Sequence, residues 1–304
     1  MDLTQPTYQD LGQPEPIHPL FADGLPESIE SWQSLRDRLK EQLAGVVGTP
    51  SFDIFNMKPE QIDSFEQPNY VGTVYKQPTG PTTRQTILVM EPKRVKISPS
   101  PGMVIPFYHP DAMSGYDLQS HRPIIEDRII QFGRHLVQQG YVVVCAEAFP
   151  FNTVQEPEED RGFAWWEAAA EQLHSDHPKW TGIGKLVWDT GRAMDLLLNQ
   201  QDVDHDRVGV MGHSLGGKMS FYSGVMDERV MATVCSDFGM GFSFTNWDAP
   251  WYLGEQIHRP DFSIAHHHLL AIHAPRPFLL IGGEADRPAS WQYINEARPV
   301  YALY

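Results

Sequence analysis

The chain has few cysteines, no long apolar run and no excess of basic residues. Its 304 residues include 2 cysteines, and 23 Lys and Arg stand against 39 Asp and Glu, which gives a formal net charge of −16. Nucleic acids and anionic membranes attract proteins that carry an excess of Lys and Arg, so this balance argues against both partners. No apolar run approaches the roughly 20 residues that a membrane span needs.

Targeting and redox features are also missing. The polar, proline-rich residues 1–20 contain no basic start followed by an apolar stretch, so they do not resemble a signal peptide. Cys145 and Cys235 each lie inside an apolar, strand-like run, which predicts buried and reduced thiols. We therefore expect a cytoplasmic protein.

Metal and cofactor motifs are absent as well. His266, His267 and His268 are adjacent, and consecutive residues on a helix point in different directions, so they cannot all face one ion. The segment Gly182–Lys185 lacks the upstream glycine and the following Ser or Thr of a phosphate-binding loop. The acidic run 156–160 is interpreted as a solvated loop. We expect neither a metal nor a cofactor.

The order of predicted elements indicates the fold class. Residues 1–70 are predicted to form an irregular extension with one helix, and residues 71–304 the main domain, with long excursions at 149–181 and 237–260. The periodicity predicts strands and helices in alternation after an antiparallel start. The strands are Val71–Lys76, Thr86–Met90, Met103–Tyr108, Tyr141–Ala146, Val208–Met211, Val230–Cys235 and Phe278–Ile281; the helices are Ser28–Ala44, Ile124–Gln139, Lys185–Asn199, Lys218–Met226, Ser263–Ile272 and Ser290–Tyr304. This pattern predicts an α/β fold, a mostly parallel sheet with helices on both faces.

The most informative segment is Gly212-His213-Ser214-Leu215-Gly216, between a predicted strand and a predicted helix. This is the G-x-S-x-G nucleophile elbow in the context that it requires. A Cβ at Gly212 or Gly216 would collide with a neighbouring strand or helix, and the turn would lift the Ser214 hydroxyl clear of the backbone. The alternative is a glycine-rich turn whose serine merely caps the helix.

Two further parts of a site follow from the fold, because reacting groups gather beyond the carboxyl ends of the strands. Asp286 follows the strand Phe278–Ile281 and is predicted as the acid that orients an imidazole, with Glu284 and Asp237 as rivals. The N–H of Leu215 is the natural first donor of an oxyanion hole. Pro110 has no N–H, so the second donor is predicted at His109 or Asp111.

The general base is missing. The triad order requires a histidine after the acid, and residues 287–304 contain none. We expect that the sequence is a fragment that lacks the last strand and helix of its fold; the alternatives are that an upstream histidine acts or that the site is inactive. His213 adjoins the nucleophile but is disfavoured as the base. The chain as given is therefore expected to turn over esters slowly or not at all.

The two excursions are rich in aromatic residues, which are Phe163, Trp165, Trp166 and Trp180 in the first and Trp247, Trp251 and Tyr252 in the second. Both excursions leave the carboxyl ends of strands, so they could form the walls of a substrate pocket, for example for a sugar or an aromatic acid. The alternative, that they form the cores of the excursions, is equally open.

With these residues in view, the chain resembles the α/β-hydrolase superfamily, and most of all its bacterial dienelactone-hydrolase and acetyl-xylan-esterase-like branch. The resemblance covers about residues 70–304 and rests on the His109 loop, Gly140–Val144, Trp180–Lys185 with Trp188-Asp189, Asp204–Gly217 and Ala274–Ile281. It implies hydrolysis of a small-molecule carboxylic ester through an acyl-enzyme on Ser214, without a cofactor. The missing histidine and Pro110 depart from that branch. A serine peptidase of the same fold and a catalytically silent binding protein remain the alternatives.

Overall fold

The computed structural model describes residues 11–304 apart from 13, 22, 23, 25, 27, 53–57 and 156–161. The central strands show why these segments form a sheet that is covered on both sides. Along β3 (Arg84–Pro92), Ile87 and Val89 belong to one buried cluster and Leu88 and Met90 to another. Successive side chains of a strand point to opposite faces, so an unbroken apolar run requires a cover on each face.

Eight strands form the main sheet of the described residues, in the order β1-β2-β3-β7-β4-β8-β9-β10. β1, β2, β3 and β7 pair antiparallel, whereas β7, β4, β8, β9 and β10 pair parallel. The strands not yet bounded are β1 (Glu60–Glu66), β2 (Tyr70–Pro78), β4 (Ser100–Phe107), β7 (Val142–Glu147), β8 (Val203–His213), β9 (Ala232–Ser236) and β10 (Phe278–Ile281). The predicted α/β class, with a mostly parallel sheet and an antiparallel start, is confirmed.

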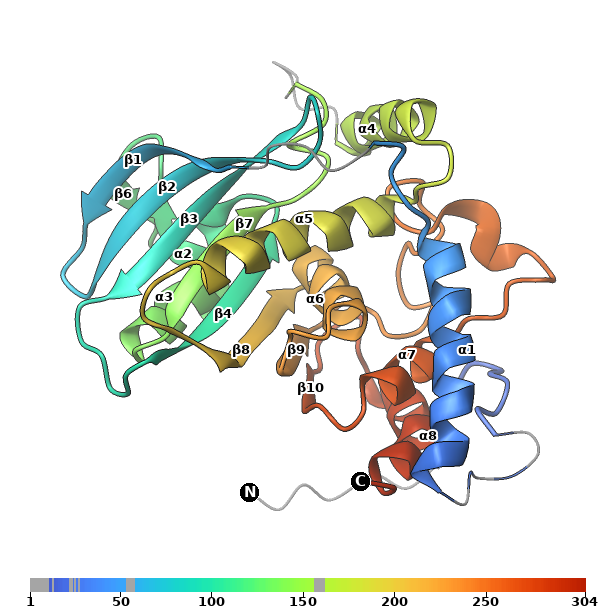
Figure 1. Cartoon of the computed structure of the whole chain (residues 1–304). Coiled ribbons are helices and arrows are strands. Elements are labelled where there is room, and N and C mark those ends of the chain that lie inside the picture. The colour runs from blue at the N-terminus through green and yellow to red at the C-terminus, as the bar shows by residue number, and fades with distance from the viewer. Residues whose placement is uncertain are drawn as a thin grey trace.

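Helices cover both faces of this sheet, as predicted. α5 packs its Ala193 and Leu197 in the cluster that contains Ile87, while α2 and α3 contribute Met113 and Val137 to the cluster of the opposite face. Figure 1 shows α5 crossing one face of the sheet and α1 standing beside α7 and α8. The helices are α1 (Ile29–Val47), α2 (Pro110–Ser114), α3 (Phe132–Gln138), α4 (Phe163–Asp176), α5 (Gly182–Leu198), α6 (Leu215–Met226), α7 (His266–His273) and α8 (Trp291–Tyr301). A short hairpin pairs β5 (Tyr116–Asp117) with β6 (Arg122–Pro123).

The structure corrects three of the predicted segments. The extension 1–70, predicted to be irregular outside its one helix, contains the strand β1, which joins the main sheet. The excursion 149–181, for which no helix was predicted, contains the helix α4. The helix predicted over Ile124–Gln139 is confined to α3, because Asp127 has a left-handed backbone with φ 47° and Ile129 is 83% exposed. The acidic run 156–160 lies outside the described residues.

The core contains both cysteines, and the N-terminal extension packs against the main domain. Cys145 and Cys235 are buried free thiols in β7 and β9, as predicted. In α1, Arg36 donates its Nε–H to the carbonyl oxygen of Ile272 in α7 at 3.1 Å, which ties the extension to the main domain. None of the helices in the described ranges is long and apolar enough to span a bilayer.

Candidate active site

Ser214 occupies the turn between β8 and α6. Its backbone has φ 51° and ψ −114°, a conformation that costs a non-glycine residue about 1–3 kcal/mol. The N–H of Ser214 donates to the carbonyl oxygen of Ser236 in β9 at 2.8 Å, so the turn is fixed against the sheet. The Ser214 side chain makes no capping hydrogen bond to α6. The turn therefore strains its backbone without using the hydroxyl for the helix, which removes the alternative of a simple helix cap.

The two glycines of the elbow are required by contact with backbone. A Cβ at Gly212 would overlap the carbonyl oxygen of Gly216 in the first turn of α6. A Cβ at Gly216 would overlap the carbonyl oxygen of Pro106 in β4. Both obstacles are main-chain atoms in packed elements, so they cannot move aside cheaply. The strand, the turn and the helix can approach this closely only because both positions lack a side chain.

Ser214 faces a cavity of about 260 Å³ at the carboxyl ends of the parallel strands. Its lining joins the elbow to both excursions and to the loop after β10. The lining residues are Tyr108, Phe163, His213, Ser214, Lys218, Asp237, Phe238, Thr245, Asn246, Tyr252, Glu284 and Ala285. Of the aromatic residues that sequence analysis singled out, Phe163 and Tyr252 line this cavity, whereas Trp247 and Trp251 are buried in the core. The core interpretation therefore holds for Trp247 and Trp251, while a substrate wall at Phe163 and Tyr252 stays a prediction.

Lys218 brings an amine to the same cavity, one helical turn after Ser214. The residue is 3% exposed, and its Nζ donates to the Thr245 Oγ1 at 2.7 Å. The Nζ also lies 4.2 Å from the ring centre of Trp247 and 4.4 Å from that of Tyr252. Burial takes water from the ammonium group and lowers the pKa of Lys218 to about 7. An amine donor that lines the cavity together with Ser214 is thus held by a hydroxyl and two aromatic faces.

The predicted acid Asp286 is buried, and four hydrogen bonds hold its carboxylate. One carboxylate oxygen accepts from the N–H groups of Phe238 and Gly239 at 2.8 and 2.9 Å, and the other accepts from the N–H of Met240 at 2.7 Å and the Ser290 hydroxyl at 2.8 Å. A carboxylate has about four acceptor sites, so these bonds use all of them. Asp286 lines a cavity next to β10 and not the one at Ser214.

Its rival Asp237 lines the cavity at Ser214. The Asp237 carboxylate accepts from the N–H groups of Glu284, Ala285 and Asp286 at 3.0, 2.8 and 2.9 Å, which uses three of its about four acceptor sites. Its backbone is left-handed, with φ 48°. The roles of all three acids stay predictions, but Asp237 is the better placed of the two aspartates for work at Ser214.

The predicted oxyanion donors lie around the elbow and the end of β4. Leu215 is the first residue of α6, where N–H groups have no partner within the helix and the helix dipole is positive. Tyr108 lines the cavity, but the side chains of His109 and Asp111 do not. The Nδ1 of His109 lies 3.6 Å from the Oε1 of Glu147, and the Asp111 carboxylate accepts from the N–H of Leu118 at 2.9 Å. The second donor stays a prediction.

No histidine in the described lining bonds to the Ser214 hydroxyl. His213 lines the cavity, but its Nδ1 pairs with the Ser236 hydroxyl at 3.2 Å. Among the described residues, the three adjacent histidines of α7 are occupied elsewhere and in different directions. His266 contacts Tyr222 through Nε2 at 3.0 Å, and His267 contacts the carbonyl oxygen of His18 at 2.9 Å. Nothing in the described ranges groups His, Cys, Asp or Glu side chains as a metal site would.

Three lining residues of the cavity were not recognised from the sequence pattern used above. They are Lys218, Thr245 and Asn246. For Lys218 a signal was present, because residues four apart on a helix lie on the same face and Ser214 immediately precedes the helix. Thr245 and Asn246 carry no such signal. Their place depends on how the excursion 237–260 folds back over α6.

Comparison with known proteins finds similarity to esterases and to a hydrolase. A family model described as "Glucuronyl esterase, fungi" matches residues 172–247. YtaP of Bacillus subtilis (strain 168), provisionally named a hydrolase, is 29% identical over 164 residues, which are 51% of this chain and 50% of the relative. Carbohydrate esterase MZ0003, from an unknown prokaryotic organism, is 27% identical over 134 residues, 38% of this chain and 31% of the relative. The matches thus span half or less of the length of these curated relatives.

Among solved structures, a provisionally named acetyl xylan esterase of Bacteroides fragilis NCTC 9343 superposes with a TM-score of 0.69 at 18% identity, covering 94% of this chain and 75% of that one. At this identity the likeness shows the fold. The matches to a glucuronyl esterase model, a hydrolase and a carbohydrate esterase agree with the expected resemblance to esterases. The likeness to dienelactone hydrolases stays a prediction.

Proposed function

We propose that this chain is a serine hydrolase of carboxylic esters that forms an acyl-enzyme on Ser214. The observation that carries the proposal is the strained serine at the tip of the β8–α6 turn, which faces the cavity and does not cap the helix. The family model and the relatives named as a hydrolase and a carbohydrate esterase support ester hydrolysis over the peptidase and over the silent binding protein. A cytoplasmic location also stays a prediction.

In the proposed reaction the Ser214 oxygen adds to the ester carbonyl and gives a tetrahedral oxyanion. The bond between the carbonyl carbon and the alcohol oxygen then breaks, and the alcohol leaves with the proton that the Ser214 hydroxyl has lost, while the acyl group stays on Ser214. The N–H of Leu215, with a backbone donor near His109–Asp111, would stabilise the oxyanion at the positive end of α6. Water then releases the acid. Of the two aspartates, Asp237 is the one that we propose to act at the cavity. Asp286 instead holds the loop that follows Asp237.

The cavity also favours a substrate class. Lys218 and Asn246 offer polar contacts, and Phe163 and Tyr252 offer aromatic faces, a combination that suits a hydroxylated ring. We infer that the ester belongs to a carbohydrate, in agreement with the names of the matched family and of MZ0003.

Covalent labelling tests the proposal. In the described cavity neither His213 nor Lys218 bonds to the Ser214 hydroxyl, so we expect slow turnover and use stoichiometric modification as the readout. A fluorophosphonate should modify the wild-type chain at Ser214, and the Ser214→Ala variant should stay unmodified. Equal labelling of both proteins would overturn the proposal. Rates with acyl esters and aminoacyl amides, measured in parallel, separate the esterase from the peptidase.

A further inference from the structure

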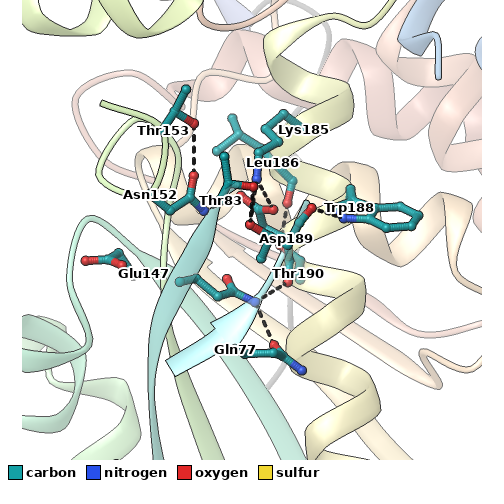
Figure 2. Close-up of polar contacts among 12 residues, drawn as sticks. Gln77, Thr83, Glu147, Asn152, Thr153, Lys185, Leu186, Trp188, Asp189 and Thr190 are labelled. Carbon is teal, nitrogen blue, oxygen red and sulfur yellow. Dashed lines mark hydrogen bonds and ion pairs between the residues drawn. The ribbon is translucent and has the colours of Figure 1, made fainter. Parts of the chain in front are cut away.

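A buried charged network lies on α5, outside the lining of the Ser214 cavity. Lys185 and Asp189 face each other one turn apart on α5, and their side chains are 2% and 0% exposed. Figure 2 shows this ion pair between the β2–β3 connection and the loop that carries Asn152. Neither Lys185 nor Asp189 lines the Ser214 cavity, so we assign the pair no direct contact with a substrate.

Each charge is tied to a different part of the chain. The Nζ of Lys185 donates to the Thr79 hydroxyl at 3.1 Å and pairs with one carboxylate oxygen of Asp189. The other carboxylate oxygen accepts from the Asn152 Nδ2 at 2.7 Å. Asn152 is itself buried, and its Oδ1 accepts from the Thr153 hydroxyl at 3.1 Å. The ion pair therefore ends in a short, charge-assisted hydrogen bond to a loop.

Stability alone does not account for this arrangement. Removing two charges from water costs several kcal/mol per ion, and a well-packed apolar pair of similar volume is often as stable or more stable. The folded chain nevertheless places the carboxyl group of Asp189 where it can hold one loop amide, that of Asn152. The contacts of the Asn152 loop indicate what this arrangement contributes.

The loop that Asn152 anchors supports the end of β4. The N–H of Ala148 donates to the carbonyl oxygen of Tyr108 at 3.5 Å, and the N–H of Phe151 donates back to the carbonyl oxygen of Ala148 at 3.0 Å. The Phe151 ring centre lies 4.1 Å from that of His109 and 6.0 Å from that of Tyr108. Phe151, next to the anchored Asn152, thus packs directly on the Tyr108–His109 segment.

That segment belongs to the site. Tyr108 lines the cavity at Ser214, and the backbone that follows it is the predicted source of the second oxyanion donor. Donors act only when they are held at the position of the developing charge, and a misplacement of about 1 Å can cost 10²-fold in rate. A small movement of the loop would therefore displace the Tyr108–His109 segment, which forms one wall of the Ser214 cavity through Tyr108.

We propose that Asn152, held by the buried Lys185–Asp189 pair, is a positioning residue that fixes the Tyr108–His109 wall of the Ser214 cavity. The inference rests on the function proposed above for its effect on rate. Its structural part, the fixing of the wall, is independent of that function.

The test compares Asn152→Ala with Gln77→Leu, a matched control. Gln77 is 3% exposed and accepts from Gln85, which donates to the carbonyl oxygen of Asp189, but Gln77 lies on the side of the network away from the loop. Both variants lose buried hydrogen bonds and should lose similar stability. Ser214 labelling by the fluorophosphonate should slow about tenfold in Asn152→Ala and stay near the wild-type rate in Gln77→Leu.

Hydrogen exchange of backbone amides tests whether the wall is fixed without depending on a reaction at Ser214. The backbone amides of residues 105–115 should exchange faster in Asn152→Ala than in Gln77→Leu. Unchanged exchange and unchanged labelling in Asn152→Ala, or equal effects of both variants, would overturn the positioning role. If wild-type Ser214 does not label at all, the proposed function fails, and the exchange comparison still decides whether Asn152 fixes the wall.

Discussion

The carboxylate of Asp237 accepts a hydrogen bond from the N–H of Asp286 at 2.9 Å, and the carboxylate of Asp286 accepts one from the N–H of Phe238 at 2.8 Å. The loops after β9 and β10 thus hold each other through reciprocal side-chain-to-backbone bonds. Asp237 keeps one side toward the cavity, whereas Asp286 is enclosed. The two loops are thereby fixed relative to each other.

Replacing Asp286 should destabilise the fold. In Asp286→Asn an amide group would meet N–H donors that now bond to a carboxylate, which leaves buried donors without acceptors. We expect a loss of about 2–4 kcal/mol in the free energy of unfolding, from lost hydrogen bonds to a charged group. Urea denaturation measures it. A variant as stable as the wild type would show that the carboxylate does not hold the 238–240 loop.

The elbow glycines should tolerate no side chain. We expect Gly216→Ala to lower the free energy of unfolding and to abolish labelling of Ser214, because the new Cβ meets the Pro106 carbonyl oxygen. Gly191→Ala is the matched control: its Cβ would meet nothing within 4 Å, and alanine is a better helix former by about 1 kcal/mol. Thermal denaturation should therefore move in opposite directions for the two variants. A Gly216→Ala protein with normal labelling would contradict the described turn.

The elbow could be predicted from the sequence because its requirements are local. Glycines at 212 and 216, an apolar strand before them and a helix after them sufficed. β1 was missed because its residues are exposed or half-buried and show no clear apolar alternation. The helix over Ile124–Gln139 was predicted too long because apolar spacing does not reveal that Ile129 faces solvent.

The site could be predicted only in part, for a physical reason. Chain order pointed to Asp286, but which carboxylate faces the cavity depends on how the loops after β9 and β10 cross. The burial of Lys218 likewise depends on Trp247 and Tyr252, which fold back from another segment. Long-range contacts of this kind leave no periodic signal.

The buried amine of Lys218 predicts a pH dependence of stability. Its pKa falls from the ordinary value of 10.5 to about 7 on folding. Between these values the unfolded chain binds more protons, so this residue makes the free energy of unfolding rise with pH, by up to about 1.4 kcal/mol per unit. Below pH 7 both states are protonated and the cost of burying the ammonium is complete.

Lys218→Met removes this contribution. Relative to the wild type, the variant should be most favoured near pH 6, and its advantage should shrink steadily between pH 7 and pH 9. Urea denaturation of both proteins across this range gives the difference directly. A difference that does not change with pH would mean that Lys218 keeps an ordinary pKa in the folded protein.

The Lys185–Asp189 pair should separate stability from positioning. Lys185→Met leaves a buried carboxylate without its counter-ion and should cost about 3–5 kcal/mol. The double variant Lys185→Met with Asp189→Leu should recover most of that stability, because no buried charge remains. It should nevertheless label slowly at Ser214, since Asn152 has lost its acceptor. Recovery of both stability and labelling rate would contradict the positioning role of Asn152.

The central claim is that the Ser214 oxygen accepts an acyl group. Incubation with p-nitrophenyl acetate near neutral pH, an acid quench and peptide mapping by mass spectrometry test it directly. We predict one acetyl group on the peptide that contains Ser214, and none on that peptide in Ser214→Ala. An unmodified Ser214, or acetylation confined to other residues such as Lys218, would contradict the account.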